Sequence, residues 1–354
     1  MIKNKRGMVM PLVLMTLLIL SLLGVVLLQY SVADSKQVAI DQQQLQAYYL
    51  ARSGADAVAQ HILNNPAQAA TLISANKSSP VSLGSGNFEV LVFGNPENEI
   101  LIEATGTVNG VSQKATLSIV KLNLFDVALA ANSINITGNA ARIYGNVTYK
   151  NTFSVATGVI PSPWTATKNT SLYYPPATFP SDAGLALIPV NGSMKFSGQQ
   201  TESISVNSRG TLIEMKNNNH KLNVHLGNIT HEDRVLKVDT FTLNGGDLTL
   251  HGKGRLLLYI NNFVGGGNFK IAPGSDASIV VFVSAGGSFS MNGTPEFKGA
   301  IYAPGASVDL QGNVSFTGSI VANTITGGGN VTVTYSPINT SNLPIPLYSR
   351  GVWR

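Results

Sequence analysis

The chain of 354 residues contains no cysteine. Disulfide bonds, thiolate metal sites and cysteine nucleophiles are therefore excluded, and an oxidising compartment is neither required nor ruled out. Charged residues are scarce as well, at 12% of the chain, roughly half the share of an average soluble domain. A surface with so little charge is uncommon among helix-rich enzymes.

The basic residues do not form a surface for nucleic acid. The net charge is +5, and three of these charges, Lys3, Lys5 and Arg6, lie within the first six residues. No basic stripe with interleaved aromatic residues occurs elsewhere, so nucleic acid is not expected as a partner.

The composition favours a β-rich extracellular protein. Hydrophobic residues make up 44% of the chain and glycine occurs 35 times, while Ser, Thr and Asn crowd the second half. A chain of this length and composition buries a sizeable core, in one large or two modest domains. We therefore expect folded β modules rather than disorder.

The first long feature is an apolar run from Met8 to Leu28 without a charge. A helix over these residues, at about 1.5 Å per residue, spans the roughly 30 Å hydrocarbon core of a membrane. Lys3, Lys5 and Arg6 precede the run and Asp34 follows it, so the positive-inside rule places the N-terminus in the cytoplasm.

Helix-compatible sequence continues from Gln29 through Leu63 without a breaker. A single helix over residues 8–65 is predicted, apolar over its transmembrane half (8–28) and amphipathic afterwards, ending near Pro66. A cleaved secretory signal and a plain single-span anchor are alternatives, although a secretory signal has a shorter apolar region and a small-residue cleavage site.

The N-terminal region resembles type IV pilins, and most of all the PilX-type minor pilins. The resemblance covers about residues 1–65 and rests on Lys3-Asn-Lys-Arg-Gly-Met8, the apolar run and Ala47-Tyr-Tyr-Leu-Ala-Arg-Ser-Gly-Ala-Asp-Ala57. It implies a leader over residues 1–7, cut by prepilin peptidase after Gly7, with Met8 as the new and methylated N-terminus. It also implies other pilin subunits as partners of the helix.

One position departs from the pilin pattern. Most pilins carry a glutamate as the fifth residue of the mature chain, and Leu12 stands there. The salt bridge from that glutamate to a neighbour's N-terminal amine is therefore lost, which suits a subunit that meets no such amine, as at a filament tip. The departure also keeps open an uncut, single-span membrane protein.

Residues 80–124 change to an alternating pattern, which predicts a small antiparallel sheet with a hairpin at Asn109-Gly110. Packed on the second half of the long helix, this sheet completes an α+β, pilin-like unit.

Residues 127–335 are predicted to form an all-β solenoid (β-helix). A small residue followed by x-apolar-x-apolar recurs about every 20 residues, for example at Gly246, Gly267, Gly287, Ala306 and Gly329. The pattern predicts an opening turn near residues 133–147, a Pro-rich insertion at 161–180 and a tail at 336–354 that caps the last turn. A β-sandwich is the alternative architecture.

No catalytic, cofactor or metal site is predicted. The closest histidines, His220, His225 and His231, match no metal motif and are expected at a solvated loop edge. Acids are sparse in the solenoid, where Asp247 and Asp309 are expected at equivalent turn positions. The glycine runs lack the Gly-Lys-Ser/Thr of a phosphate loop and are expected at corners.

The sequence therefore predicts a non-enzymatic minor pilin or pseudopilin, held in the cytoplasmic membrane by its N-terminal helix and displayed outside the cell. Assembly initiation, a tip position and adhesion to a glycan or to a host or environmental surface are not separated by the sequence. A bitopic β-solenoid scaffold is one alternative. A polysaccharide-active enzyme is another, and a groove with two or more carboxylates would favour it.

Overall fold

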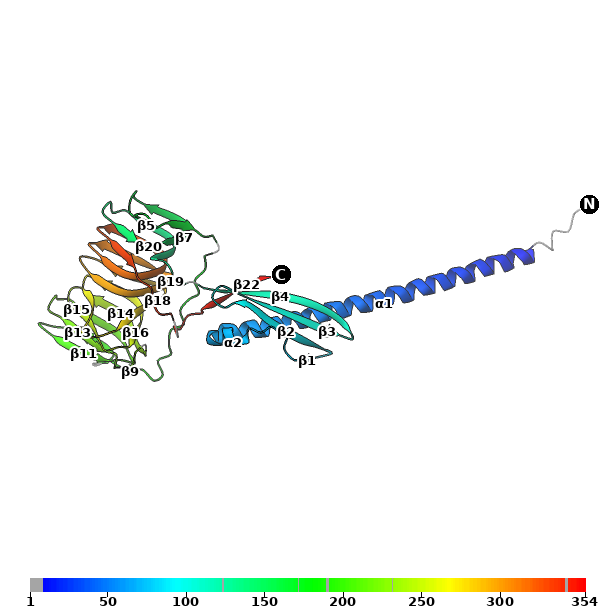
Figure 1. Ribbon diagram of the computed structural model, residues 1–354, viewed down its shortest axis with the longest axis horizontal. Helices are drawn as coiled ribbons and strands as arrows, with labels where there is room; N and C mark the ends of the chain where they lie inside the picture. Colours follow the sequence, from blue (N-terminus) through cyan, green and yellow to red (C-terminus); the bar gives the residue numbers. More distant parts are fainter. Residues whose placement is uncertain (1–8, 123, 171, 189–190, 231, 341–342) are drawn as a thin grey trace, which may run out of the picture. The chain divides into compact units, whose positions relative to one another are not determined.

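The computed structural model describes residues 9–122, 124–170, 172–188, 191–230, 232–340 and 343–354. These residues form two units (Figure 1). Unit 1 contains the described residues up to Leu122 together with Pro346–Arg354, and unit 2 comprises the described residues between them. The predicted fold class is confirmed: a long helix with a small antiparallel sheet is followed by a β-solenoid.

Unit 1 is built on one helix, α1 (Val9–Asn64), of 56 residues, which ends before the proline that cannot continue it. A short 3-10 turn, Pro66–Gln68, and α2 (Ala69–Leu72) follow. The sheet has the strand order β1-β2-β3-β4-β22. Its strands are β1 (Val81–Leu83), β2 (Gly86–Asn95), β3 (Glu99–Val108), β4 (Val111–Lys121) and β22 (Tyr348–Trp353).

The sheet is antiparallel throughout. Asn109 and Gly110 connect β3 to β4 with φ angles of 48° and 82°, as a two-residue hairpin turn requires. The residues expected as a C-terminal tail contribute the fifth strand, because β22 pairs antiparallel with β4. Unit 2 is thus inserted in the chain between two neighbouring strands of unit 1.

Strand β22 is fixed to α1 by side chains. Arg350 forms an ion pair of 2.8 Å with Asp56, and the Arg52 guanidinium lies 4.9 Å from the centre of the Trp353 ring. Tyr348 is buried in the core of unit 1 and donates a hydrogen bond of 2.9 Å to the carbonyl oxygen of Pro96. Trp353 therefore has a structural position inside unit 1.

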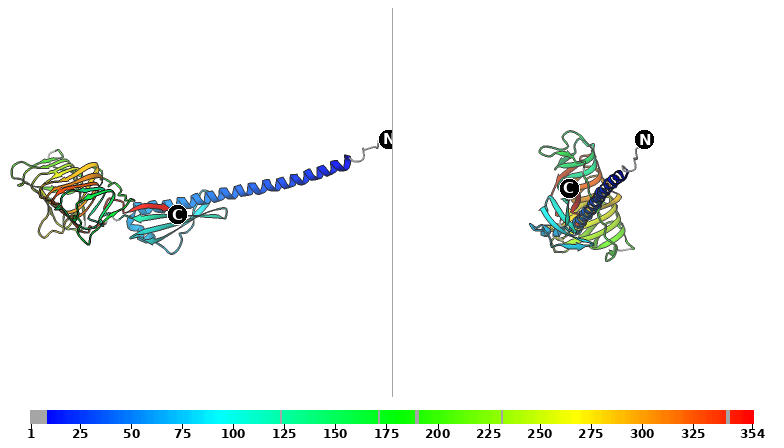
Figure 2. Two further views of the ribbon diagram at one scale, coloured as in Figure 1. Left: turned by 90° about the horizontal axis from the view of Figure 1, so that it is seen from above. Right: turned by 90° about the vertical axis from the view of Figure 1, so that its right-hand side faces the viewer.

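Unit 2 is a parallel β-solenoid, visible as stacked strands in Figures 1 and 2. Each turn contributes short stretches to three faces, and apolar residues at alternate positions point into one shared core. In one turn, for example, the first face is formed by residues 233–238, the second by 240–243 and the third by 247–251. The strands are β5 (Leu129–Ile136), β6 (Arg142–Tyr144), β7 (Val147–Val155), β8 (Ala166–Lys168), β9 (Ala186–Leu187), β10 (Ser193–Lys195), β11 (Thr201–Ser205), β12 (Ser208–Met215), β13 (Lys221–His225), β14 (Asp233–Leu243), β15 (Asp247–His251), β16 (Arg255–Gly265), β17 (Asn268–Ile271), β18 (Ser278–Met291), β19 (Glu296–Gly312), β20 (Ser315–Gly329) and β21 (Thr332–Tyr335).

The stacking order of the turns differs from the chain order. The main sheet runs β10-β12-β14-β16-β18-β19-β20-β5-β7-β8, and β20 pairs in parallel with β5 through Ile320↔Leu129 and Ile325↔Ile134. The stretch expected as the opening turn therefore lies inside the stack. The chain starts there, leaves at β8, returns to the opposite end at β9 and β10, and builds turn by turn back to β5.

Residues 172–188, here called the return segment, make this crossing. The segment overlaps the predicted Pro-rich insertion, but it runs along the first face of the solenoid instead of projecting from one turn. Tyr302 donates a hydrogen bond of 2.6 Å to the Pro175 carbonyl oxygen, and the Phe179 ring lies 5.1 Å from that of Tyr259. Further along, Lys237 forms an ion pair of 2.7 Å with Asp182.

The outward side chains beneath this path are apolar. Leu257, Tyr259, Phe282 and Tyr302 are at most 4% exposed, although they alternate with the residues of the inner core. The first face therefore has a hydrophobic layer on each side, which explains why its strands read as continuous apolar runs.

Candidate functional site

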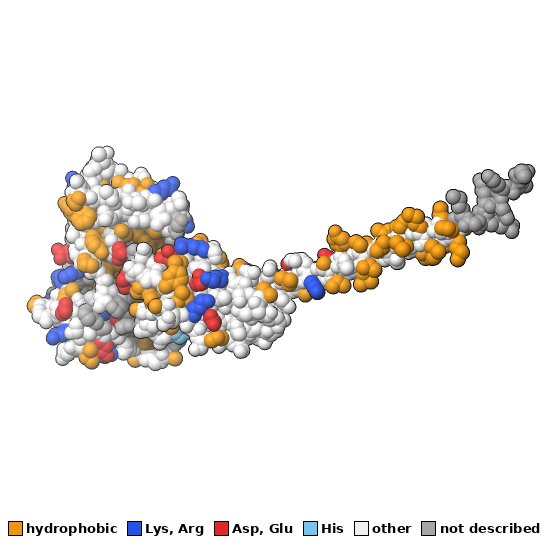
Figure 3. All heavy atoms as spheres, turned by 45° about the vertical axis from the view of Figure 1, so that its right-hand side comes forward, with side chains coloured by type: hydrophobic (Ala, Val, Ile, Leu, Met, Phe, Trp, Pro, Cys, Tyr) orange, Lys and Arg blue, Asp and Glu red, His pale blue; other side chains and the backbone are white. Residues whose placement is uncertain are grey.

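The first half of α1 is an exposed apolar surface. Its large hydrophobic residues from Met10 to Leu28 are between 46% and 73% exposed, and Figure 3 shows them covering that stretch of the helix. Among the described residues, α1 is the one helix that is long and apolar enough to cross a membrane by its length and composition. Leu12 belongs to this surface and is 66% exposed.

The C-terminal part of α1, from Ala47, packs against a partner within the chain. Ala47, Ala51, Ala55 and Ala59 follow helical spacing and are fully buried, and the last three belong to the core that α1 shares with the sheet of unit 1. The approach is close, since a Cβ atom built on Gly106 of β3 would lie 2.1 Å from the Ala47 carbonyl oxygen. Among the described residues of α1, the fully buried apolar side chains begin at Ala47.

The other residues predicted for processing and orientation, Lys3, Lys5, Arg6, Gly7 and Met8, lie outside the described residues. Their roles stay predictions.

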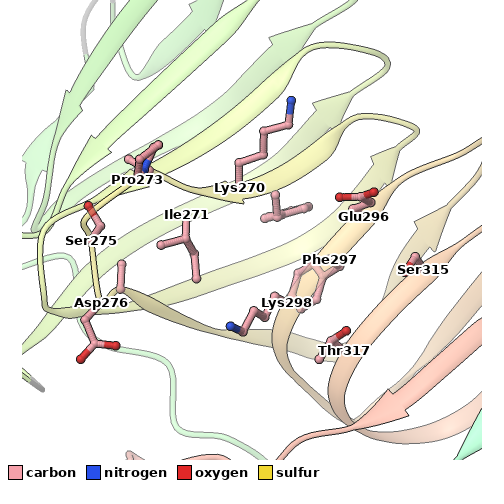
Figure 4. A pocket seen from close by; sticks show the side chains of 13 residues that line it. Lys270, Ile271, Pro273, Ser275, Asp276, Glu296, Phe297, Lys298, Ser315 and Thr317 are labelled. Atoms are coloured by element: carbon pink, nitrogen blue, oxygen red, sulfur yellow. The ribbon is translucent and has the colours of Figure 1, made fainter.

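A groove on the third face of the solenoid is the candidate for small-molecule chemistry (Figure 4). It has a volume of about 720 Å³ and lies between β17, the loop after it, and the start of β19. The ladder β11-β13-β15-β17 stops at this point, and residues 296–299 start a second ladder with β20. The Glu296 backbone N–H bridges the two by donating to Asn268 Oδ1 at 3.2 Å.

This groove contains two carboxylates, Asp276 and Glu296, with Lys270 and Lys298. Figure 4 shows the carboxylates at opposite ends of the groove, with Lys298 between them. Glycoside hydrolysis by paired carboxylates needs the two acids to flank one bond, about 5 to 9.5 Å apart. Lys270 is held by Asp247 at 2.8 Å. The groove thus carries the two carboxylates that the polysaccharide-active alternative requires.

The histidines occupy different places. His220 was expected at a solvated edge, and this is wrong: it is 2% exposed and its Nε2 atom lies 2.7 Å from the Gly198 carbonyl oxygen. His225 and His251 stack in register with ring centres 4.8 Å apart, and His231 lies outside the described residues. Within the part of the chain that the structure describes, no group of three His, Asp or Glu residues is placed to hold a metal ion.

The comparisons with known proteins add little to this geometry. Residues 213–338 match the model of a family described as a domain of unknown function (DUF7305), and this stretch runs from β12 past β21. No curated protein matches the chain.

Among solved structures, the chain is similar to the competence-associated pilin ComZ from Thermus thermophilus. The likeness has 12% sequence identity, covers 88% of this chain and 97% of that chain, and has a TM-score of 0.28. At this score it assigns neither fold nor function.

The structure also shows a surface that the sequence analysis missed. On the second face of the solenoid, strands from β14 to β7 present two columns of outward residues made mostly of Ser, Thr and Asn. In the sequence, Ser, Thr and Asn residues already flank the apolar position of each x-apolar-x stretch. The sequence does not show that these residues line up in columns, because this depends on the register of the paired strands.

Proposed function

We propose that the chain is a non-enzymatic, type IV pilin-like subunit, anchored in the cytoplasmic membrane by the first half of α1 before assembly. After assembly the same apolar surface packs among the helices of neighbouring subunits. The solenoid is then displayed outside the cell.

One observation carries the proposal: a continuous helix of 56 residues that packs one face of its C-terminal part, from Ala47, on its own sheet, while its large apolar side chains from Met10 to Leu28 are exposed. Exposing the fifteen large apolar side chains from Met10 to Leu28 to water is strongly unfavourable, at roughly 25 cal/mol per Å² of apolar area. Lipid and the apolar helices of other subunits both remove this cost. The helix therefore suits a protein that moves from a membrane into a filament.

We further propose that prepilin peptidase removes residues 1–7 and that Leu12 suits a subunit at the filament tip. A carboxylate at position 12 would require a partner amine in an apolar setting. The leucine side chain at position 12 needs no partner amine, so the subunit can join the filament without the N-terminus of a neighbouring subunit next to Leu12.

The test is mass spectrometry of the N-terminus of the protein from its native membrane, in cells with and without prepilin peptidase. The proposal expects Met8, methylated, in the first cells and Met1 in the second. A Gly7→Val variant should keep Met1 in both. If Met1 is intact in both cells without this substitution, the chain is a bitopic membrane-anchored solenoid and the pilin proposal fails.

A further inference from the structure

The second face of the solenoid carries an ordered array of hydroxyl and amide groups. From β14 to β7 its first outward column is composed entirely of Ser, Thr and Asn. In stacking order, the column is Thr240, Asn262, Ser288, Ser307, Thr324, Ser133 and Thr152. The second column, two residues further along each strand, is Thr242, Val264, Ser290, Asp309, Thr326, Asn135 and Ser154. We call these two columns the hydroxyl face.

The hydroxyl face is continuous. The register irregularities of these strands lie between the first and second faces, for example between Ile260 and Asn262, and none interrupts the two columns. Neighbouring strands are about 4.8 Å apart and residues i and i+2 about 6.6 Å apart. The seven strands therefore present a regular grid about 29 Å long.

No described segment covers the hydroxyl face, in contrast to the first face with its return segment. Each of its side chains is partly or fully accessible. Hydrogen bonds run along the columns, as from Ser288 Oγ to Asn262 Oδ1 at 3.1 Å and from Thr326 Oγ1 to Asp309 Oδ1. These bonds order the side chains before any ligand arrives, so less side-chain conformational entropy is lost on binding.

The chemistry of the hydroxyl face excludes most classes of partner. Asp309 is the one charged residue of the two columns, so the grid attracts neither nucleic acid nor an anionic membrane surface. Aromatic and arginine side chains, the usual anchors of protein interfaces, do not occur in it. Hydroxyl and amide groups both donate and accept hydrogen bonds, and the matching ligand presents the same groups at repeated intervals.

We propose that the hydroxyl face binds a neutral polysaccharide, laid along the solenoid axis. Each hydrogen bond exchanged with water contributes little alone, so a single sugar is held weakly and a polymer that engages many strands is held well. Ice is another regular array of hydroxyl groups. Asn262, Val264, Asp309 and Asn135 interrupt the uniform rows of hydroxyl groups that a crystal face needs, whereas a flexible chain adapts to them.

This inference rests on the proposed display of the solenoid outside the membrane, but its test does not. The full chain, purified in detergent, is mixed with insoluble cellulose and chitin, with an anionic polysaccharide, and with growing ice, and the bound fraction is measured. Soluble oligosaccharides of increasing length then compete for binding. We expect retention on at least one neutral polymer, and competition that strengthens with oligosaccharide length.

The decisive variant is the double substitution Thr242→Lys and Ser290→Lys, which flanks Val264 at the β14 end of the second column. Two long cations there disrupt the grid and should lower binding about tenfold. The matched control is Thr332→Lys with Thr334→Lys, on β21 of the third face, and should bind as the parent does. Far-ultraviolet circular dichroism and the thermal transition verify that both variants fold.

Three results would overturn the proposal: no retention on any neutral polymer, equal retention of both double variants, or recovery in the ice fraction instead. None of them bears on the cleavage after Gly7. Conversely, an uncut N-terminus leaves the binding result unchanged, so the two proposals fail separately.

Discussion

Glycine at position 106 sets how closely α1 approaches the sheet of unit 1, and Gly106→Ala tests this packing. A Cβ atom there would lie 2.1 Å from the Ala47 carbonyl oxygen and 2.7 Å from the Ala51 nitrogen, where 3.4 Å is ordinary contact. Both obstacles are helix backbone, which no side-chain rotation removes. The helix must therefore retreat by about 1 Å, which forfeits up to half of the dispersion energy at the interface.

Overpacking of a core costs about 1–3 kcal/mol, and a backbone obstacle places Gly106→Ala near the upper end. For a unit of this size, about 3 kcal/mol lowers the melting temperature by roughly 10 °C. Trp353 lies in unit 1 against Arg52, so its fluorescence reports this transition once Trp164 has been replaced by phenylalanine.

Gly24→Ala is the matched control, because no atom lies within 4 Å of a Cβ built there. This variant should leave the Trp353 transition of the detergent-solubilised chain unchanged. If Gly106→Ala also melts within about 2 °C of the parent, the close packing of α1 on β3 is not what stabilises unit 1, and the reasoning fails.

Two further predictions concern the solenoid. Arg255 is 3% exposed and forms two hydrogen bonds to Asp233, of 2.6 and 2.9 Å. Asp233→Asn should therefore destabilise unit 2 by about 3 kcal/mol, measured by urea unfolding with Trp164 fluorescence in a chain whose Trp353 is replaced by phenylalanine. An unchanged midpoint would contradict a stabilising pair. The hydrogen bond from Lys237 lowers the pKa of Asp182 in the folded chain. The ion pair that attaches the return segment is therefore fully formed above the ordinary aspartate pKa, and it is lost as the pH falls through the lowered pKa of the folded chain. Pepsin cleavage of the parent chain within residues 172–188 should therefore become faster in strong acid. In Asp182→Asn the same cleavage should already be fast at higher pH. Equal cleavage rates for the parent and Asp182→Asn at the higher pH would argue against the attachment.

The sequence predicts where the strands of the solenoid lie in the chain better than it predicts which face each strand belongs to. The motifs at Gly246 and Gly267 lead into β15 and β17 on the third face, whereas those at Gly287 and Ala306 lead into the second face. Both faces use a short x-apolar-x-apolar stretch after a corner, so their local patterns are alike. Asp247 and Asp309 were expected at equivalent positions, and this is wrong, because they lie on different faces.

The true period of the solenoid is also less regular than the motif suggests. In-register partners are 26 residues apart at Asn262 and Ser288 and 17 residues apart at Asp309 and Thr326. Corners of different length change the sequence separation of in-register residues without changing how the strands pair. The docking of β5 on β20 has no local signal at all, because parallel pairing between distant segments is decided by packing.

The stacking order follows from the insertion of unit 2 between β4 and β22. A solenoid built in chain order has its ends at opposite poles of the stack, whereas β4 and β22 are adjacent strands. Starting at β5 and finishing at β20 and β21 places both ends of unit 2 on neighbouring turns. Inserted domains generally need such close ends, and the return segment is the connection that this arrangement requires.

The length of that connection is testable. From β8 to β9 the first face spans nine strand spacings, about 43 Å, and the chain from Lys168 to Ala186 reaches about 60 Å when fully extended. Deleting seven residues, 176–182, reduces the reach to about 40 Å, so β8 and β9 can no longer both join the stack, and cooperative unfolding of the solenoid should be lost. Inserting seven Gly and Ser residues at exposed Tyr173 costs well under 1 kcal/mol in loop entropy and should leave that transition intact.

The deletion also removes the contacts of Phe179 and Asp182. A third chain, in which residues 176–182 are replaced by seven Gly and Ser residues, keeps the length of the segment and removes only these contacts. If this chain fails as the deletion does, the segment acts through its side chains and not through its length.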